Sequence, residues 1–301
     1  MLKDRYINPL TDYGFKKLFG TEVNKDLLID FLNQILPEHH RVKDLSYLQN
    51  ERMPSAEVDR KAVFDIYCES ESGEKFIVEM QKAKQNFFKD RSVFYMTFPI
   101  QEQAKKGDWN FELSAVYAIG ILDFIFDDSP REYSGSAEDA IQTIYFKNQH
   151  NDIFFDKLNL QFIELPKFTL TEDQLVTQKD KWLYVLRHLA YLNNRPETLR
   201  ERVFTKVFEQ AEISKFTPEE RGDYESSLKY YRDIKNVIDT AKGEGFSEGM
   251  EKGKEEGIIE GMEKGKLEKN IEIARSMKSK GLDNSIITDI TGLTKGEIDK
   301  L

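Results

Sequence analysis

The sequence predicts an α/β fold followed by a C-terminal helical extension. Apolar residues recur at helical spacing over residues 12–36. Two short stretches, 62–68 and 75–81, are rich in β-branched and aromatic residues and flank a polar turn, which predicts a β-hairpin. A continuous apolar run over 113–122 is typical of a buried central strand. Residues 179–301 show helical patterns instead.

Turn and capping residues divide these stretches into elements. Gly20 separates two N-terminal helices, and we expect Asp12, next to Thr11, to cap the first. A helix is predicted over 86–106, with a kink or break caused by Pro99. Further short strands are expected at 45–50, 141–146, 153–155 and 160–165.

The polar turn determines which residues of the hairpin face each other. A three-residue loop over 71–73 ends in glycine, which adopts the left-handed conformation that such loops need. This loop sets Asp65 opposite Glu79, with Cβ atoms about 4.5–5.5 Å apart. Gln81, two residues beyond Glu79, projects on the same side. A loop one residue shorter would oppose Asp65 to Met80 and place the acids on opposite faces.

Each otherwise apolar strand of the hairpin carries an acid. Burying an unpaired carboxylate costs several kcal/mol, so this pattern indicates a function. Two carboxylates and an amide suit Mg²⁺, which takes oxygen ligands and is held by one or two carboxylates plus substrate phosphate. The predicted metal ligands are Asp65 and Glu79, with Gln81 beside them. Glu57 and Asp59 compete with Asp65, but an adjacent basic pair is typical of ion-paired surface.

The most specific motifs are Asp65 in Phe64-Asp65-Ile66-Tyr67 and the triplet Glu79-Met80-Gln81. They resemble the PD-(D/E)XK nuclease superfamily and, more narrowly, its Rpn (recombination-promoting nuclease) or PD-(D/E)XK transposase-like branch. The resemblance covers about the first 240 residues. A leading segment matches as well: Asn8-Pro9, Asp12, Phe15-Lys16, Leu18-Phe19-Gly20, Phe31-Leu32-Asn33 and Ile35-Leu36. Phe64 replaces the proline that names the motif, and Gln81 replaces its lysine.

The resemblance implies a restriction-endonuclease-like α-β-β-β-α-β core, whose third strand is 75–81 if the strand near 45–50 is counted. It also implies a Mg²⁺-dependent DNA endonuclease associated with recombination or mobile elements. Asp65 and Glu79 would bind the metal, Gln81 would orient the attacking water, and Asp12 is a possible first-helix ligand. Since glutamine lacks the lysine charge, the alternative is a catalytically weak module that binds nucleic acid or protein through its C-terminal helices.

DNA binding requires local positive charge, because the whole chain has a formal net charge of −10. Basic residues gather after the triplet, with Phe87 and Phe88 interleaved: Lys82, Lys84, Lys89 and Arg91. In related nucleases a Gln-xxx-Tyr pair on the following helix flanks the site, and Arg91-xxx-Tyr95 is similar to it. We expect Lys82, Arg91 and Tyr95 to bind substrate. The alternative is that Tyr95 packs on the sheet while Arg91 is solvated.

The C-terminal part contains a repeat. Glycine recurs every fourth residue from Gly245 to Gly265 among Glu and Lys, which indicates either close packing of two helices, in one chain or between two, or a flexible charged linker. The last residues resemble a helix-turn-helix that either reads DNA or dimerises. The expected domains are a nuclease-like domain over 1–175, a helical subdomain over 176–240, the glycine segment over 241–269 and the terminal module over 270–301.

The chain shows no signal for secretion or membrane insertion. A single cysteine fits a reducing compartment, and the most apolar run, 113–126, is shorter than the roughly 20 residues that a membrane helix needs. We therefore expect a cytoplasmic protein with DNA as its partner, without membrane association, and with homo-oligomers through the C-terminal helices as a possibility left open.

Overall fold

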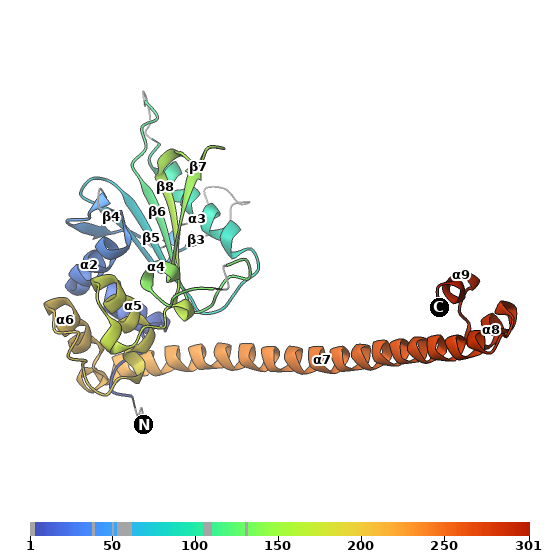
Figure 1. Cartoon of the computed structure of the whole chain (residues 1–301). Coiled ribbons are helices and arrows are strands. Elements are labelled where there is room, and N and C mark those ends of the chain that lie inside the picture. Colours follow the sequence, from blue (N-terminus) through green and yellow to red (C-terminus); the bar gives the residue numbers. More distant parts are fainter. Residues whose placement is uncertain (1–3, 38–39, 50, 53–61, 105–109, 130–131) are drawn as a thin grey trace. The chain divides into compact units, whose positions relative to one another are not determined.

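The computed structural model describes residues 4–37, 40–49, 51–52, 62–104, 110–129 and 132–301. A mixed sheet lies at its centre, with strand order β1-β4-β5-β6-β8-β7 (Figure 1). Strands β5, β6 and β8 are parallel, and the other neighbours are antiparallel. The strands of this sheet are β1 (Leu45–Tyr47), β4 (Ile66–Ser70), β5 (Lys75–Gln81), β6 (Val116–Leu122), β7 (Ile141–Lys147) and β8 (Ile153–Glu164). Strands β2 (Glu51–Arg52) and β3 (Ala62–Val63) form a separate pair.

Helices cover both faces of the sheet (Figure 1). On one face, Trp182 of α5 packs against Phe19 and Phe31 of α1 and α2 and against Phe204 of α6, with ring centroids 5.1–5.7 Å apart. On the other face lies α3. The helices are α1 (Asp12–Phe19), α2 (Lys25–Ile35), α3 (Phe88–Glu102), α4 (Ala137–Ala140), α5 (Gln178–His188), α6 (Arg202–Ala211), α7 (Pro218–Ser279), α8 (Asn284–Thr291) and α9 (Lys295–Asp299). The predicted α-β-β-β-α-β order is therefore confirmed as α2, β1, β4, β5, α3 and β6.

The alternation of side chains along β5 explains how the sheet joins two cores. Phe76 and Val78 enter the large core beneath α1, α2 and α5, whereas Ile77 packs beneath α3 with Tyr67. Glu79 follows Ile77 on the α3 side. The predicted central strand is confirmed, because every residue of β6 is buried. The core therefore presents the odd-numbered residues of β5 to α3.

Three element predictions were wrong. The stretch 62–68 is interrupted at Phe64 and Asp65. In a continuous strand the Met80 N–H would donate to a backbone carbonyl of the neighbouring strand, but here it donates to the Asp65 carboxylate. The stretches 153–155 and 160–165 form one strand, β8, whose polar residues in between hid its continuity. Of the kink or break predicted at Pro99, the break does not occur: helix α3 continues three residues beyond Pro99, since proline in the last turn removes only one helical hydrogen bond.

The cap of α1 also differs from the prediction. Thr11, and not Asp12, is the N-cap: its hydroxyl accepts the Gly14 N–H at 3.0 Å. Asp12 is the first helical residue and pairs with Lys16 at 2.9 Å. The preference of threonine for the extended cap conformation explains the shift by one residue. Asp12 is thereby left with its carboxylate on the helix surface.

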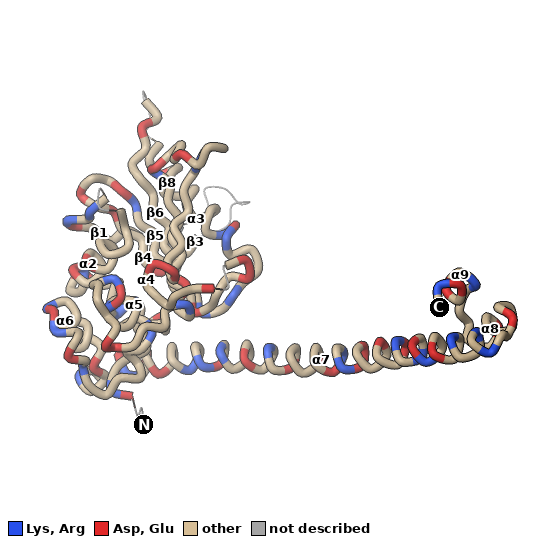
Figure 2. Tube along the Cα trace, in the orientation of Figure 1, with Lys and Arg blue, Asp and Glu red and all other residues tan. Residues whose placement is uncertain are grey.

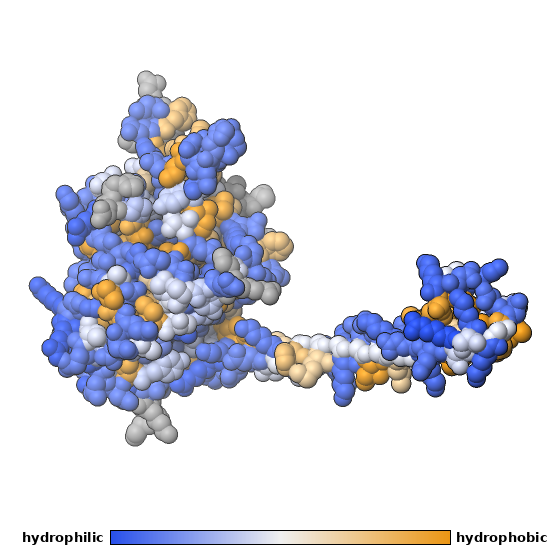
Figure 3. Space-filling view, viewed as in Figure 1, coloured by the Kyte–Doolittle hydropathy of each residue, from blue (hydrophilic) through white to orange (hydrophobic). Residues whose placement is uncertain are grey.

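The chain divides into two compact units, 1–236 and 237–301. In the second unit the glycine repeat lies inside α7, so this segment is helical. Figure 2 shows basic and acidic residues interspersed along it, and hydrophobic groups are visible among its exposed side chains in Figure 3. The end of α7 packs with α8 and α9 around Ala274, Ile287 and Ile298. Within the described part of the chain, no helix has the length and apolar character that crossing a membrane requires.

Candidate active site

The β4–β5 hairpin has the predicted register. Ile66 pairs with Val78 and Tyr67 with Ile77. The connection is the predicted three-residue loop, since the Ser70 N–H donates to the Glu74 carbonyl at 2.9 Å. Its last residue, Gly73, has φ +85°, a left-handed conformation that glycine adopts without a Cβ clash. This register brings Asp65, one residue before β4, to the level of Glu79.

Two hydrogen bonds cross between Asp65 and the Glu79-Met80 segment. The Asp65 N–H donates to Glu79 Oε1 at 3.2 Å. In the other direction, the Met80 N–H donates to Asp65 Oδ2 at 2.8 Å. Each carboxylate therefore accepts from the backbone of the neighbouring segment. The two acids meet at the end of the hairpin that is opposite its loop.

Burial and a neighbouring acid raise the pKa of both Asp65 and Glu79. Burial, together with the Asp65 carboxylate, raises the pKa of Glu79 to about 8, while the Asp65 N–H and Arg91 act in the opposite direction. Burial likewise raises the pKa of Asp65, and Asp12 adds to this shift against the lowering effect of the Met80 N–H. Two crowded acids that resist ionisation are stabilised by a cation placed between them. The donor set is therefore of the kind that a divalent cation relieves.

A metal ion at this position would find few protein ligands. Among the described residues, no group of three His, Cys, Asp or Glu side chains is arranged to hold a metal. The candidate set is the Asp65 and Glu79 pair, and such a pair fits Mg²⁺, which retains waters and takes its remaining ligands from a phosphate. The competing acids Glu57 and Asp59 lie outside the described residues.

Asp65 and Asp12 line one cleft of about 910 Å³. Lys16 and Lys17 of α1 form another part of its wall, and the beginning of α7 contributes Ser227. The cleft is open to solvent on the α1 side of the hairpin. Asp12, the acid of the first helix, thus shares this cleft with Asp65.

Gln81 and Arg91 are in direct contact. Arg91 Nη2 donates to Gln81 Oε1 at 2.7 Å, and Gln81 Nε2 donates to the Ala83 carbonyl at 2.9 Å. The Arg91 guanidinium also lies 5.8 Å from the Tyr95 ring centroid. Tyr95 packs edge-on against Phe64 at 5.2 Å, as its packing alternative predicts. Glu79, Arg91 and Tyr95 nevertheless line the same small cavity beneath α3.

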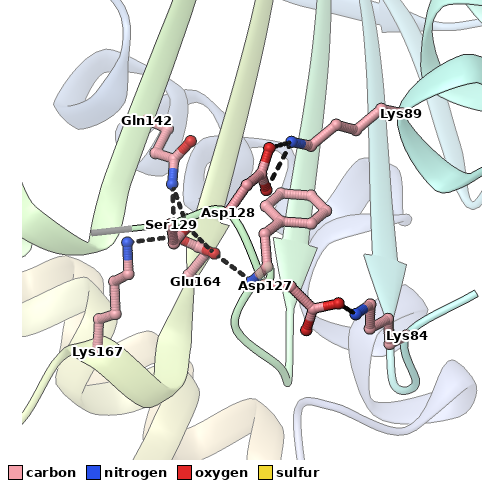
Figure 4. A network of polar contacts seen from close by, with 9 residues as sticks. Lys84, Lys89, Asp127, Asp128, Ser129, Gln142, Glu164 and Lys167 are labelled. Atoms are coloured by element: carbon pink, nitrogen blue, oxygen red, sulfur yellow. Dashed lines mark hydrogen bonds and ion pairs between the residues drawn. The ribbon is translucent and has the colours of Figure 1, made fainter. Parts of the chain in front are cut away.

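The lysines after the triplet have separate environments. Lys82 is partly buried with its Nζ 5.0 Å from the Tyr230 ring centroid. Burial lowers its pKa, whereas Asp12 and Asp65 act to raise it. Lys84 and Lys89 are exposed and pair with Asp127 and Asp128, respectively (Figure 4). The basic cluster is thus partly neutralised by acids from the loop after β6, a pairing that the sequence analysis missed.

A buried ion pair behind that loop was missed as well. Glu164, at the end of β8, lies 2.5 Å from Lys167, and both side chains are almost fully buried (Figure 4). Glu164 also accepts from the Phe126 N–H at 2.6 Å and from Ser129 Oγ at 2.7 Å. The available signal was an acid in a largely apolar strand, which also singled out Glu79. This network anchors the loop that carries Asp127 and Asp128.

The comparison with known families decides the classification. The model described as PD-(D/E)XK nuclease family transposase matches residues 9–241. The chain belongs to this family. In this family member, Asp65 and the Glu79-Met80-Gln81 triplet both lie within the matched region.

The terminal module of the PD-(D/E)XK family member has its own match. The model described as Rpn/YhgA-like nuclease family, C-terminal HTH domain, matches residues 267–301. This range includes the last turns of α7 together with α8 and α9. The C-terminal module is therefore a helix-turn-helix domain of the Rpn/YhgA-like type. Neither the curated proteins nor the solved structures gave a match.

Proposed function

We propose that the protein is a Mg²⁺-dependent endonuclease that hydrolyses DNA phosphodiester bonds at the Asp65 and Glu79 pair, in recombination or in the movement of mobile elements. The observation that supports this most directly is the crossed pair of hydrogen bonds between Asp65 and the Glu79-Met80 segment. These bonds hold two acids with raised pKa values side by side. Membership of the PD-(D/E)XK nuclease family supports the same conclusion.

Each residue of the site then has a role. Asp65 and Glu79 hold the metal, and Asp12 is the nearest acid of the first helix. When bound, Mg²⁺ would polarise the scissile phosphate and lower the pKa of the attacking water. Gln81 orients this water through its second N–H or the second lone pair of Oε1, because Ala83 and Arg91 each engage only one of these. Arg91, which contacts Gln81, supplies the positive charge that the triplet lacks.

Substrate contacts surround this centre. Arg91 and Lys82 hold phosphates of the DNA backbone, and the Tyr95 ring positions the Arg91 guanidinium through their contact. The helix-turn-helix domain over 267–301 adds a second DNA contact, and the glycine segment of α7 allows two chains to associate. We retain 1–175, 176–240, 241–269 and 270–301 as the functional divisions of the chain. The cytoplasm, where DNA is accessible, is the proposed location.

The test is cleavage of supercoiled plasmid by the full chain with Mg²⁺ or with EDTA. Asp65→Asn and Glu79→Gln keep the shape of each side chain and remove its charge, and both should lose at least 100-fold in rate. Glu71→Gln, in the exposed loop of the same hairpin, is the matched control and should cleave like the wild type. Equal rates for the wild type and Asp65→Asn would reject the proposal. DNA binding without any cleavage would support the alternative, a catalytically weak binding module.

A further inference from the structure

Phe87 has an unusual backbone and an unusual exposure. It precedes α3 in the left-handed conformation, with φ 60° and ψ 27°. Its side chain is 79% exposed. A bulky residue in this conformation costs on the order of 1–3 kcal/mol, and an exposed ring recovers little of that through packing. The side chain of Phe87 therefore offsets little of this cost itself.

The left-handed residue separates two adjacent phenylalanines. Phe88, the next residue, is buried and packs against Phe162 and Phe126 with ring centroids 5.8 and 6.3 Å away. With a helical or extended Phe87, the chain would enter α3 in another direction. The observed conformation directs one ring into the core and the other into solvent. Phe87 is thus held outward by a well-packed neighbour.

Phe87 lies one helical turn before Arg91 of the candidate active site. The Arg91 N–H donates to the Phe87 carbonyl at 2.9 Å, so the two residues are one turn apart. Arg91 in turn contacts Gln81. Lys84 and Lys89 occur three residues before and two residues after Phe87, and both are exposed. A hydrophobic ring flanked by cations matches a nucleotide strand, in which bases alternate with phosphates.

We propose that Phe87 stacks on an unpaired nucleobase next to the scissile phosphate, so that the preferred substrate is single-stranded or locally opened DNA. This inference rests on the proposed function. Stacking of a base on an aromatic ring is sequence-tolerant and contributes substantially to single-strand binding. Apolar side chains also enter between bases of a duplex and unstack them. Arg91, Lys84 and Lys89 hold the phosphates on either side of the stacked base.

Binding without cleavage tests this proposal separately from the nuclease activity. The full chain in EDTA is titrated into a fluorescein-labelled 20-nucleotide single strand and into the corresponding duplex, and anisotropy is measured. Phe87→Ala should weaken single-strand binding roughly 5- to 150-fold, the range that corresponds to one stacked base. Phe87→Trp should restore it, and duplex binding should change less.

Phe111→Ala is the matched control. Phe111 is also left-handed, with φ 61°, and 78% exposed, but it precedes β6, whereas the site lies at the level of the end of that strand. Its replacement should leave single-strand affinity unchanged. Equal losses in both variants, or none in Phe87→Ala, would overturn the proposal.

Abasic substitutions provide a readout that altered folding alone does not produce. Single strands with one abasic position each should bind the wild type less tightly at one particular position, and this minimum should disappear in Phe87→Ala. A Phe87-dependent minimum in a protein that fails to cleave would refute the proposed hydrolysis and keep the stacking site. Dissociation of an oligomer by Phe87→Ala, without any effect on DNA binding, would assign the ring to a protein contact and reject the proposal.

Discussion

Arg91 Nη2 donates to Gln81 Oε1 at 2.7 Å, so a cation occupies the position next to the residue that replaces the lysine of the family motif. We expect Gln81→Lys to lower both cleavage and stability, because two cations would then lie in contact. The double variant Gln81→Lys, Arg91→Gln should regain most of the lost stability and activity. Plasmid cleavage and urea unfolding of the four proteins form a double-mutant cycle. Additive effects of the two changes would show that Arg91 and Gln81 act independently.

The raised pKa of Glu79 predicts how stability changes with pH. Since the folded pKa is about 8 and the ordinary value is 4.5, the folded state binds more protons between these values. Its stability should therefore fall as pH rises from 4.5 to 8. In EDTA at pH 8.5, Glu79→Gln should be more stable than the wild type by about 1–2 kcal/mol, since partial exposure screens the effect. Urea unfolding at pH 5 and pH 8.5 measures the free energy of unfolding, with Glu71→Gln as the control. A wild type that is equally stable at both pH values would contradict the predicted pH dependence.

The same shift predicts proton release on metal binding. Below pH 8, Glu79 is largely protonated, and the metal must displace this proton. The affinity for Mg²⁺ should therefore increase with pH up to about 8, and binding should release protons in weakly buffered solution. Isothermal titration in two buffers with different ionisation enthalpies measures the number released. Zero protons at pH 6.5 would contradict a protonated Glu79 that loses its proton to bind the metal.

The pairing of Lys84 with Asp127 and of Lys89 with Asp128 predicts a restraint on DNA binding (Figure 4). Replacing both acids with asparagine frees the two lysines for phosphates. The affinity for DNA should rise about two- to ten-fold at low salt, with a steeper dependence on salt concentration. Asp152→Asn with Asp156→Asn, two exposed acids of the β7–β8 region, removes the same charge elsewhere. An equal gain in DNA affinity in this control would show that the change in net charge, and not the release of Lys84 and Lys89, causes the effect.

The buried Glu164–Lys167 pair predicts strong coupling in stability. Lys167→Met leaves a buried carboxylate with one charged partner fewer and should lower the free energy of unfolding by about 3–5 kcal/mol. Adding Glu164→Gln should recover part of this loss, because the remaining amide is neutral. Urea unfolding of the single and double variants checks the expectation. If the double variant lost as much free energy of unfolding as the two single variants together, Glu164 and Lys167 would not interact directly.

Much of the fold follows from local patterns. The glycine of the 71–73 loop and the alternation of side chains in β5 were enough to predict the hairpin register, because a one-residue slip would reverse every side chain. The continuous apolar run predicted β6 for a similar reason. The interruption at Phe64 and Asp65 was not visible, since it results from a hydrogen bond between a side chain and the backbone of the next strand.

The surroundings of the site were harder to predict. Asp127 and Asp128 lie 43 and 39 residues from the lysines with which they pair, and no spacing rule connects such positions. The pairing of Arg91 with Gln81 was hidden for the same reason, although the Arg91-xxx-Tyr95 spacing placed both side chains on one face of α3. The sequence therefore predicts which residue types gather near the hairpin, whereas long-range folding determines their partners.

The bonds between Asp65 and the Glu79-Met80 segment have a consequence for the quality of each protein copy. Because these contacts exist in only one alignment of the two strands, a chain with a slipped hairpin keeps neither the alignment nor the pair of acids. A copy with a slipped hairpin therefore does not bring Asp65 and Glu79 together. For the proposed DNA cleavage, this coupling makes correct folding a condition of activity.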